Sequence, residues 1–290
     1  MVLTRRAFLG GTAALMAAAV PIRAASSAPT AAQVIARIRA AVGIAWRADT
    51  VDRIVAGDPD TPVTGIATTM MATQDVLQRA AASGCNLVIA HEPTFYDHFD
   101  KPEPLGDNPA LLAKQRLIRT KNLVVFRFHD HWHLRQPDGI ATGMVRALGW
   151  QDNAVPGRVD EFVFPATPLS AFAAALARRL DAPALRVVGD RGLPVRRVLA
   201  CWGYAALTPE RAAQVARADV DLIVAGEARE WELVELVQDQ VESGARKGLV
   251  LLNHVASEQA GMAYCAEWLQ TFIKDLRIRF IPTADPFWRP

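Results

Sequence analysis

The chain alternates between short apolar runs and longer segments in which apolar residues recur at helical spacing. Runs such as CNLVIA (85–90) predict buried strands, and segments such as AAQVIARIRAAV (31–42) predict amphipathic helices. In the first half this pattern predicts strands at 62–70, 85–90 and 122–129, and helices at 31–42, 74–84, 108–121 and 138–149. Gly84 and Gly149 are placed to end two of these helices, and Pro109 is placed to begin another.

The same alternation continues to the C-terminus. It predicts strands at 160–166, 184–190, 195–202, 220–226, 248–253 and 276–282, and helices at 168–180, 208–218, 230–244 and 257–273. The segments at 184–190 and 195–202 are expected to pair across RGLP, and Ser257 is expected to cap the long last helix. The very apolar strands at 220–226 and 248–253 are typical of sheets covered by helices on both faces.

Regular alternation of helices and strands predicts an α/β fold. The passages SGCNLVIAHE (83–92) and ADVDLIVAGE (218–227) share a helix end, an apolar strand and a glutamate at the strand exit. This similarity predicts two equivalent α/β lobes. Because 150–158 is polar and contains proline and glycine, we expect the first lobe at 29–155 and the second at 156–290.

The first 28 residues have the pattern of a twin-arginine signal peptide. Arg5 and Arg6 precede a short apolar run, and small residues follow Pro21. The run is too short to span a bilayer, so we expect cleavage near Ala25–Ala28 and no stable membrane insertion afterwards. The predicted location is the periplasm or the exterior of the cell.

The composition of the chain argues against several classes of function. The chain is 51% hydrophobic and 21% charged, with a net charge of +2, which is typical of a globular protein without a basic nucleic-acid-binding surface. We therefore expect no nucleic-acid partner. Its three cysteines include no CxxC pair, which argues against a disulfide framework and against a thiolate zinc site.

Histidines and carboxylates cluster where predicted strands end, which is where open α/β sheets bind ligands. His91 and Glu92 follow one strand, and both can reach one centre if the chain turns at Pro93. In FHDHWH (128–133), a continuing strand would separate His129 from His133, whereas a turn would bring Asp130 or His133 inward. His131 is a better candidate for supporting a ligand than for being one. A solvent-exposed loop is the alternative interpretation of both segments.

Two further segments carry candidate residues. His254 and Glu258 are four apart, which places both on one face of a helix and suits a divalent metal. Glu227 and Glu230 follow another strand, where either can act as a general base. The structural alternatives are an exposed ion pair and an acidic first helical turn.

These residues exceed the three or four protein ligands of a single zinc ion and suit a two-metal centre with a bridging water. The expected ligands are His91, Glu92, His129, Asp130, His133, His254 and Glu258. Without thiolates, the expected cofactors are two divalent ions of zinc, manganese, iron or nickel.

The ordered set NLVIAHEPTFY, NLVVFRFHDHWH, DLIVAGEAREWE and NHVASEQAG resembles the Nif-three-like dinuclear metal-centre proteins, also known as type 2 GTP cyclohydrolase I. The resemblance covers roughly residues 30–285. It implies two α/β lobes that face each other, with two metals in the cleft between them, the C-terminal segment completing that cleft, and a homo-oligomer, commonly a hexamer.

The resemblance also assigns individual residues. His91 matches the first residue of a His-His pair, Glu92 replaces the second, and His129 matches a histidine of the middle motif. His133 stands where an aspartate is usual, so Asp130, Glu92 or Glu258 would have to bridge the metals. His254 and Glu258 match the closing pair, and Glu227 and Glu230 match an acidic element near the cleft. CWGYAAL replaces a turn richer in glycine.

The predicted function is a metal-dependent hydrolase that uses a metal-bridging water on an unidentified small molecule. One alternative is a ring-opening activity on GTP, which an exported location and the absence of a GxxxxGK[ST] loop disfavour. The other is a metal-binding or scaffold protein without catalysis.

Overall fold

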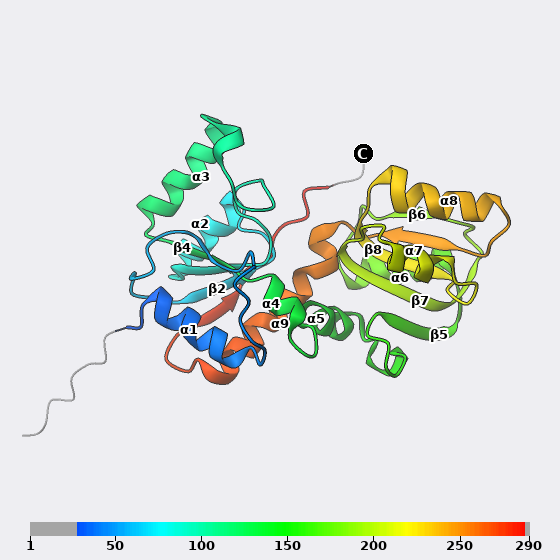
Figure 1. Ribbon diagram of the computed structural model, residues 1–290, viewed down its shortest axis with the longest axis horizontal. Coiled ribbons are helices and arrows are strands. Elements are labelled where there is room, and N and C mark those ends of the chain that lie inside the picture. The colour runs from blue at the N-terminus through cyan, green and yellow to red at the C-terminus, as the bar shows by residue number, and fades with distance from the viewer. Residues whose placement is uncertain (1–27, 288–290) are drawn as a thin grey trace, which may run out of the picture.

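The computed structural model describes residues 28–287 as two α/β lobes, each built on a five-stranded sheet (Figure 1). The mixed α/β fold predicted from the sequence is confirmed. The signal-peptide prediction falls on residues outside the described range.

The first sheet has the strand order β1–β4–β3–β2–β10. Its strands are β1 (Ile54–Ala56), β2 (Ile66–Thr69), β3 (Leu87–Ala90), β4 (Val124–Arg127) and β10 (Ile278–Phe280). All neighbouring pairs are parallel except β1 with β4. Helices α2 (Gln74–Ala82) and α3 (Pro109–Thr120) pack on one face, and α1 (Ala31–Ala41) belongs to the core on the other. Because helices cover both faces, the central strands β2, β3 and β4 are buried along their whole length rather than on alternate residues.

The second sheet has the strand order β5–β7–β8–β9–β6. Its strands are β5 (Glu161–Pro168), β6 (Arg186–Val188), β7 (Pro194–Tyr204), β8 (Leu222–Glu227) and β9 (Gly248–Leu251). Helix α6 (Leu169–Arg179) belongs to the core between the lobes. Helices α7 (Pro209–Ala216) and α8 (Glu235–Glu242) cover the opposite face, and a π-helical turn at Glu230–Val234 precedes α8.

The predicted pairing of residues 184–190 with 195–202 is wrong. β6 pairs antiparallel with β9, whereas β7 pairs with β5 and β8. Pro194 has no N–H to donate to a hairpin ladder, and it lies opposite Pro168 of β5.

Helix α9 (His254–Phe272) connects the two lobes, since it packs on β2 and β10 of one sheet and on β7 and β8 of the other. It also packs closely on α5 (Gly139–Leu148). A Cβ atom on Gly143 would lie 2.4 Å from the carbonyl oxygen of Ala260, so this close crossing requires glycine. A continuous apolar core therefore joins the lobes and fixes the start of α9 between them.

The ends of α9 differ from the sequence prediction. The helix begins at His254, because the Asn253 side chain accepts a hydrogen bond from the Ala256 backbone N–H and caps it. Ser257, the predicted cap, lies inside the helix. After α9 the chain returns to the first lobe, where β10 pairs parallel with β2, although its residues were assigned to the second lobe. Of the helices within residues 28–287, none has the length and apolar character needed to cross a membrane.

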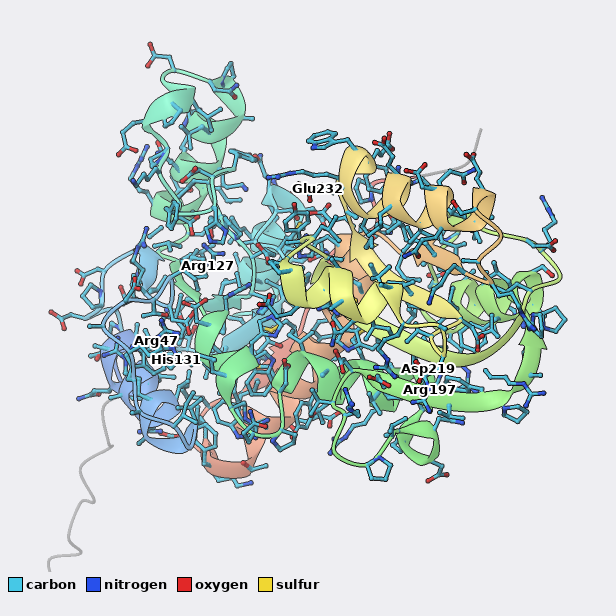
Figure 2. All side chains as sticks on the ribbon, turned by 45° about the vertical axis from the view of Figure 1, so that its right-hand side comes forward. Arg47, Arg127, His131, Arg197, Asp219 and Glu232 are labelled. Atoms are coloured by element: carbon cyan, nitrogen blue, oxygen red, sulfur yellow. The ribbon has the colours of Figure 1, made fainter. Side chains whose placement is uncertain are left out.

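Glu161 at the start of β5 makes a charge cluster that should affect stability. This buried carboxylate accepts hydrogen bonds from Arg197 and Arg217, and Arg197 also pairs with Asp219 at the edge of the lobe (Figure 2). Arg217 above all, then Arg197 and Arg158, hold the pKa of Glu161 below its ordinary value of 4.5.

A Glu161→Gln variant should therefore lose about 2 kcal/mol of stability near neutral pH, the usual value for hydrogen bonds to charged groups. Since the folded-state pKa is depressed, the carboxylate stabilises the fold above pH 4.5, and this contribution disappears as the pH falls through the folded-state value. Urea unfolding of both proteins across this pH range measures the effect. A constant difference in stability down to the lowest pH would contradict it.

Candidate metal centre

Four structural elements bring the candidate ligands together in the cleft between the lobes. His91 and Glu92 follow β3, His129 follows β4, His254 and Glu258 lie on the first turns of α9, and Glu227 ends β8. The strand ends and α9 therefore supply ligands from both lobes to one place, as the positions of these residues predicted.

The HDHWH segment settles the alternative left open by the sequence. It forms a short helix, α4 (Asp130–Leu134), with His129 at the N-cap position, so the chain turns after β4 instead of continuing as a strand. His129 and His133 consequently lie one helical turn apart, and their ring centroids are 5.0 Å apart. The turn brings His133 inward next to His91, whose ring centroid is also 5.0 Å away.

Four histidines point their Nε2 atoms towards Glu92 and Glu258. His254 Nε2 lies 3.2 Å from Glu258 Oε2 and 3.4 Å from Glu92 Oε1. The Nε2 atoms of His91 and His133 lie 3.5 and 3.8 Å from Glu258, and that of His129 lies 3.6 Å from Glu92. Two sets have ligand atoms close enough to hold an ion: His91, His129 and His133, and His91, Glu92 and Glu258.

The opposite ring nitrogen of each histidine is held by an oxygen atom outside the cluster. His91 Nδ1 contacts the Phe128 carbonyl, His129 Nδ1 contacts Asp130, His133 Nδ1 contacts Asp138, and His254 Nδ1 contacts Glu227. The distances lie between 2.9 and 3.2 Å. Such contacts favour a proton on Nδ1 and leave Nε2 free as a ligand, which is the usual arrangement of metal-binding histidines.

Two buried polar atoms in the cluster lack a hydrogen-bond partner: Nε2 of His91 and Oε2 of Glu258. His91 is fully buried and Glu258 is 3% exposed. Unpaired buried polar atoms cost free energy, and a cation between the two would satisfy both. The imidazole and carboxylate donors of the cluster can bind a metal ion, and they fit zinc, manganese, iron or nickel.

The electrostatics of the cluster also fit a cation. Burial lowers the pKa of His91 well below its ordinary value, and the neighbouring His129 and His133 lower it further, so its imidazole is neutral. Burial alone would raise the pKa of Glu92, but the hydrogen bond and charge of His254, with His129 and Arg127, lower it to about 2. His91 therefore offers a neutral imidazole and Glu92 an ionised carboxylate, the forms that bind metals. Burial alone would lower the pKa of His254, but hydrogen bonds to Glu227, Glu258 and Glu92 raise it to about 12, so a metal ion held there would displace a proton.

A cavity of about 600 Å³ opens onto the cluster. Its walls include Tyr96, Trp202 and Tyr204 in addition to the candidate ligands. A volume of this size is typical of small-molecule sites.

Comparison with known proteins places the chain in a family. Residues 33–286 match the family model described as Duf34/NIF3 (NGG1p interacting factor 3). The chain belongs to the DUF34/NIF3 family.

Two solved structures have the same fold at low sequence identity. A Bacillus cereus protein related to NIF3 superposes with a TM-score of 0.69 at 14% identity, over 91% of this chain and 100% of that protein. The Staphylococcus aureus hypothetical protein SA1388 gives a TM-score of 0.67 at 17% identity, over 91% and 100% of the two chains.

A curated relative from Clostridium acetobutylicum is named GTP cyclohydrolase 1 type 2 homolog. It is 28% identical to this NIF3 protein over 110 residues, which make up 38% of this chain and 40% of the relative. The match thus spans about two fifths of that relative's length.

Two candidates from the sequence lie outside the cluster in this NIF3 protein. Asp130 does not face it: one carboxylate oxygen binds His129 Nδ1, and the other accepts hydrogen bonds from Thr50 and the Val51 backbone N–H. These contacts hold the pKa of Asp130 well below its usual value, and we revise its role from ligand to support for His129. Glu230 forms an exposed ion pair with Arg186, 2.8 Å away, and does not line the cavity at the cluster.

His131 supports the fold, in keeping with the prediction that it is not a ligand. Its Nδ1 donates to Asp52, and its Nε2 accepts a hydrogen bond from the backbone N–H of Arg47, beside it in Figure 2. Asp52 also accepts hydrogen bonds from the backbone N–H groups of residues 129–131 and so holds the start of α4 in place. Sequence analysis missed Asp52, because nothing in its local pattern indicates a partner 77 residues away.

Arg127 is a second residue that the sequence analysis missed. It is 1% exposed, and its Nη atoms lie 3.8 Å from Glu92 Oε2 and 3.6 Å from Asp100 Oδ2. Nη2 has no hydrogen-bond partner, so the guanidinium compensates Glu92 through charge alone. The sequence did contain a signal for this role. Arg127 is a charged residue at the end of an apolar strand, and His129 and His131 follow it closely.

An Arg127→Met variant should bind metal about tenfold more weakly, because residues that support ligands typically change metal affinity by this amount or more. It should also lose about 3 kcal/mol of stability, since Asp100 is left as an uncompensated buried charge. Isothermal titration calorimetry and urea unfolding measure the two effects separately. Adding Asp100→Asn should restore stability without restoring affinity. Recovery of both would show that Arg127 affects metal binding only through the fold.

Proposed function

We propose that this protein is a dinuclear metal-binding protein and a metal-dependent hydrolase. The observation that carries the proposal is the convergence of four Nε2 atoms on two carboxylates, with every Nδ1 atom held from behind. A single ion needs only three or four of these six residues, which leaves enough for a second.

The contacts support a division of the ligands between the two ions. His129 and His133 lie on one side, and His254 lies on the other. Glu92 approaches both His129 and His254, and Glu258 approaches both His133 and His254, so each carboxylate would help to hold the ions between these histidines. The family usually has an aspartate where this chain has His133. Glu92 and Glu258 would thus supply the carboxylates that this replacement removes.

When bound, two divalent ions would lower the pKa of a shared water towards neutrality and so supply hydroxide for attack on a carbon or phosphorus centre. Glu227 would move the proton, because it is half exposed, lines the cavity at the cluster and contacts His254. Its hydrogen bond with His254 lowers its pKa, so it is ionised and can accept a proton. We no longer assign this role to Glu230.

We also propose that the protein is exported by the twin-arginine route, that it acts on a small molecule, and that it forms a homo-oligomer. These proposals rest on the N-terminal sequence pattern, the cavity size and the family resemblance. Fractionation of cells that express the full chain, followed by size-exclusion chromatography, tests the first and third.

The test of the function combines metal analysis with hydrolysis. Protein loaded separately with zinc, manganese, iron or nickel should contain about two metal ions per chain. It should cleave a p-nitrophenyl ester or bis(p-nitrophenyl) phosphate, and chelation should abolish this activity. A content below one metal ion per chain would overturn the dinuclear proposal. Full loading without cleavage of either substrate class would favour a metal-binding or scaffold protein.

A second candidate function is ring opening of GTP, which the name of the Clostridium acetobutylicum relative favours. The same metal-loaded preparations should be incubated with GTP and the nucleotide products separated by chromatography. Rapid turnover of GTP without ester or phosphodiester cleavage would place this candidate first.

A further inference from the structure

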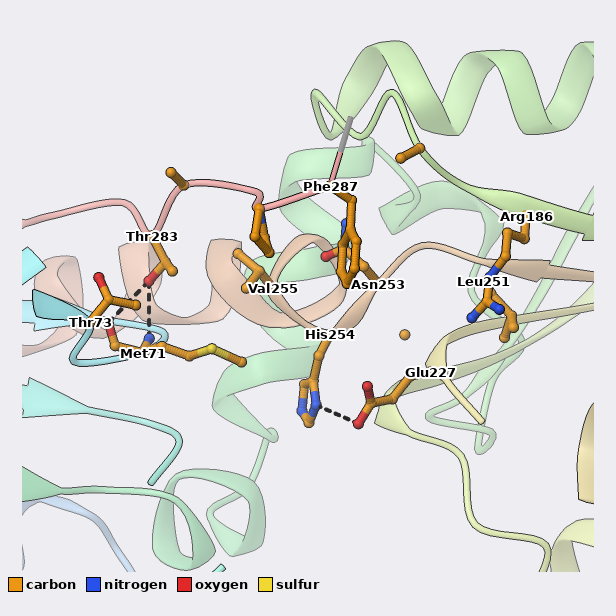
Figure 3. Close-up of a pocket in the computed structure, with 14 residues that line it drawn as sticks. Met71, Thr73, Arg186, Glu227, Leu251, Asn253, His254, Val255, Thr283 and Phe287 are labelled. Carbon is orange, nitrogen blue, oxygen red and sulfur yellow. Dashed lines mark hydrogen bonds and ion pairs between the residues drawn. The ribbon is translucent and has the colours of Figure 1, made fainter. Parts of the chain in front are cut away.

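A second cavity, of about 700 Å³, adjoins the cluster at His254 and is not lined by His129 or His133 (Figure 3). Both cavities are lined by Met71, Glu227 and His254, so they adjoin each other at these residues. Apart from His254, no candidate metal ligand lines this second cavity, so metal binding does not require it. It is available for a part of a bound molecule that does not react.

The walls of this second cavity are mainly apolar. They come from the loop after β2, from the start of α9 and from the C-terminal segment after β10, and they carry Met71, Leu251, Val255, Ala284, Pro286 and Phe287. Figure 3 shows Phe287 and Val255 lining one side of the space and Leu251 the other. Burial of an apolar group here would contribute free energy in proportion to its area.

The charges in the same walls exclude a highly anionic occupant. Among the described residues that line this cavity, Arg186 and His254 are the basic ones. Arg186 already forms an ion pair with Glu230. Glu227 stands at the junction of the cavities. A phosphate chain placed here would meet the His254 ring, a guanidinium already paired with Glu230, and the carboxylate of Glu227.

The C-terminal segment is held over the cavity by specific contacts. Asn253 donates a hydrogen bond to Asp285, and the Thr283 backbone N–H donates to Gln259. The Thr283 hydroxyl accepts a hydrogen bond from the Met71 backbone N–H, so the segment fastens to both lobes. The cavity wall is therefore built into the fold by residues from the two lobes and the chain end.

We propose that this cavity binds an apolar acyl chain, so that the molecules acted on at the metal cluster are derivatives of medium-chain carboxylic acids. The proposal rests on the proposed function for the reacting end and on the cavity alone for the apolar end. The acyl chain lies against Leu251, Val255 and Phe287, and the acyl carbon reaches the cluster past Glu227.

The test uses octanoate and butyrate as uncleavable probes. Calorimetric titration of the metal-loaded full-length protein should show octanoate binding at least about tenfold more tightly than butyrate, a conservative expectation for four buried methylene groups. Ala284→Trp fills the cavity from an exposed position and should remove this preference. Pro282→Ala, an exposed change in the same segment that does not line the cavity, should keep it.

Equal affinity for the two acids, or an unchanged preference in Ala284→Trp, would overturn the inference. Metal content, measured on the same preparations, reports on the proposed function independently. Full metal content without chain-length preference refutes only the acyl-chain site. Chain-length preference in a protein that holds less than one metal ion refutes only the dinuclear centre.

Discussion

A His91→Ala variant is expected to bind metal at least about a hundredfold more weakly than the wild type, beyond the effect typical of supporting residues. His91 belongs to both sets of residues that can hold an ion, so its loss affects both sites. It is also fully buried. Its Nε2 atom lies 3.5 Å from Glu258, and its ring stacks on the ring of His129. Metal content after loading and calorimetric affinity measure the result.

His98 provides a matched control for this variant. It is an exposed histidine of the loop after β3 and lines the cavity at the cluster, but it belongs to neither ligand set. His98→Ala should retain the metal content of the wild type. If His91→Ala also retained it, with comparable affinity, the centre described here would not be the metal site.

The same pair of variants tests the link between metal and stability. Metal that binds only the folded state at a hundred times its dissociation constant stabilises the protein by about 2.7 kcal/mol. Loading should raise the melting temperature of the wild type and of His98→Ala, and leave that of His91→Ala unchanged.

The sequence was sufficient for features that depend on local pattern. Apolar strands covered on both faces, helices ended by Gly84 and Gly149, and the one-turn spacing of His254 and Glu258 were all visible along the chain. Positions directly after strands identified His91, Glu92, His129 and Glu227, because parallel strands end at a common edge.

Features that depend on distant contacts could not be predicted in this way. The turn of α4 depends on Asp52, which binds three successive backbone N–H groups. The long strand β7 pairs with β5, and β6 pairs with β9, and in neither pair are the two strands consecutive along the chain. Gly203 was noted only as part of a changed turn. Its φ is +69°, and a Cβ atom there would lie 2.2 Å from Glu258 Oε1, so its role depends on a residue on another element.

Glu92 and Glu230 show how similar patterns can have different outcomes. Both follow a strand exit, but Glu92 comes directly after His91 and enters the cluster, whereas Glu230 begins a π-helical turn and pairs with Arg186 on the surface. The acidic first turn favoured by the helix dipole was the correct interpretation for Glu230.

A Glu92→His variant, which introduces the residue that the family resemblance expects, should weaken metal binding by about tenfold to a hundredfold. In this chain the position adjoins Arg127, and a carboxylate here compensates the guanidinium and approaches two histidines. An imidazole would remove one of the two carboxylates that face the ions and place a fifth ring beside a buried cation. Calorimetry with zinc and manganese measures the loss.

A double-mutant cycle distinguishes the charge of Glu92 from its shape. Glu92→Asp retains the charge and should lose less affinity than Glu92→His. Combining Glu92→His with Arg127→Met removes the cation that the new imidazole would face, so part of the lost affinity should return. If Glu92→His alone binds metal as well as the wild type, position 92 does not require a carboxylate. Because Glu92 and Glu258 are the two carboxylates proposed here to hold the ions, that result would leave Glu258 as the carboxylate that holds them.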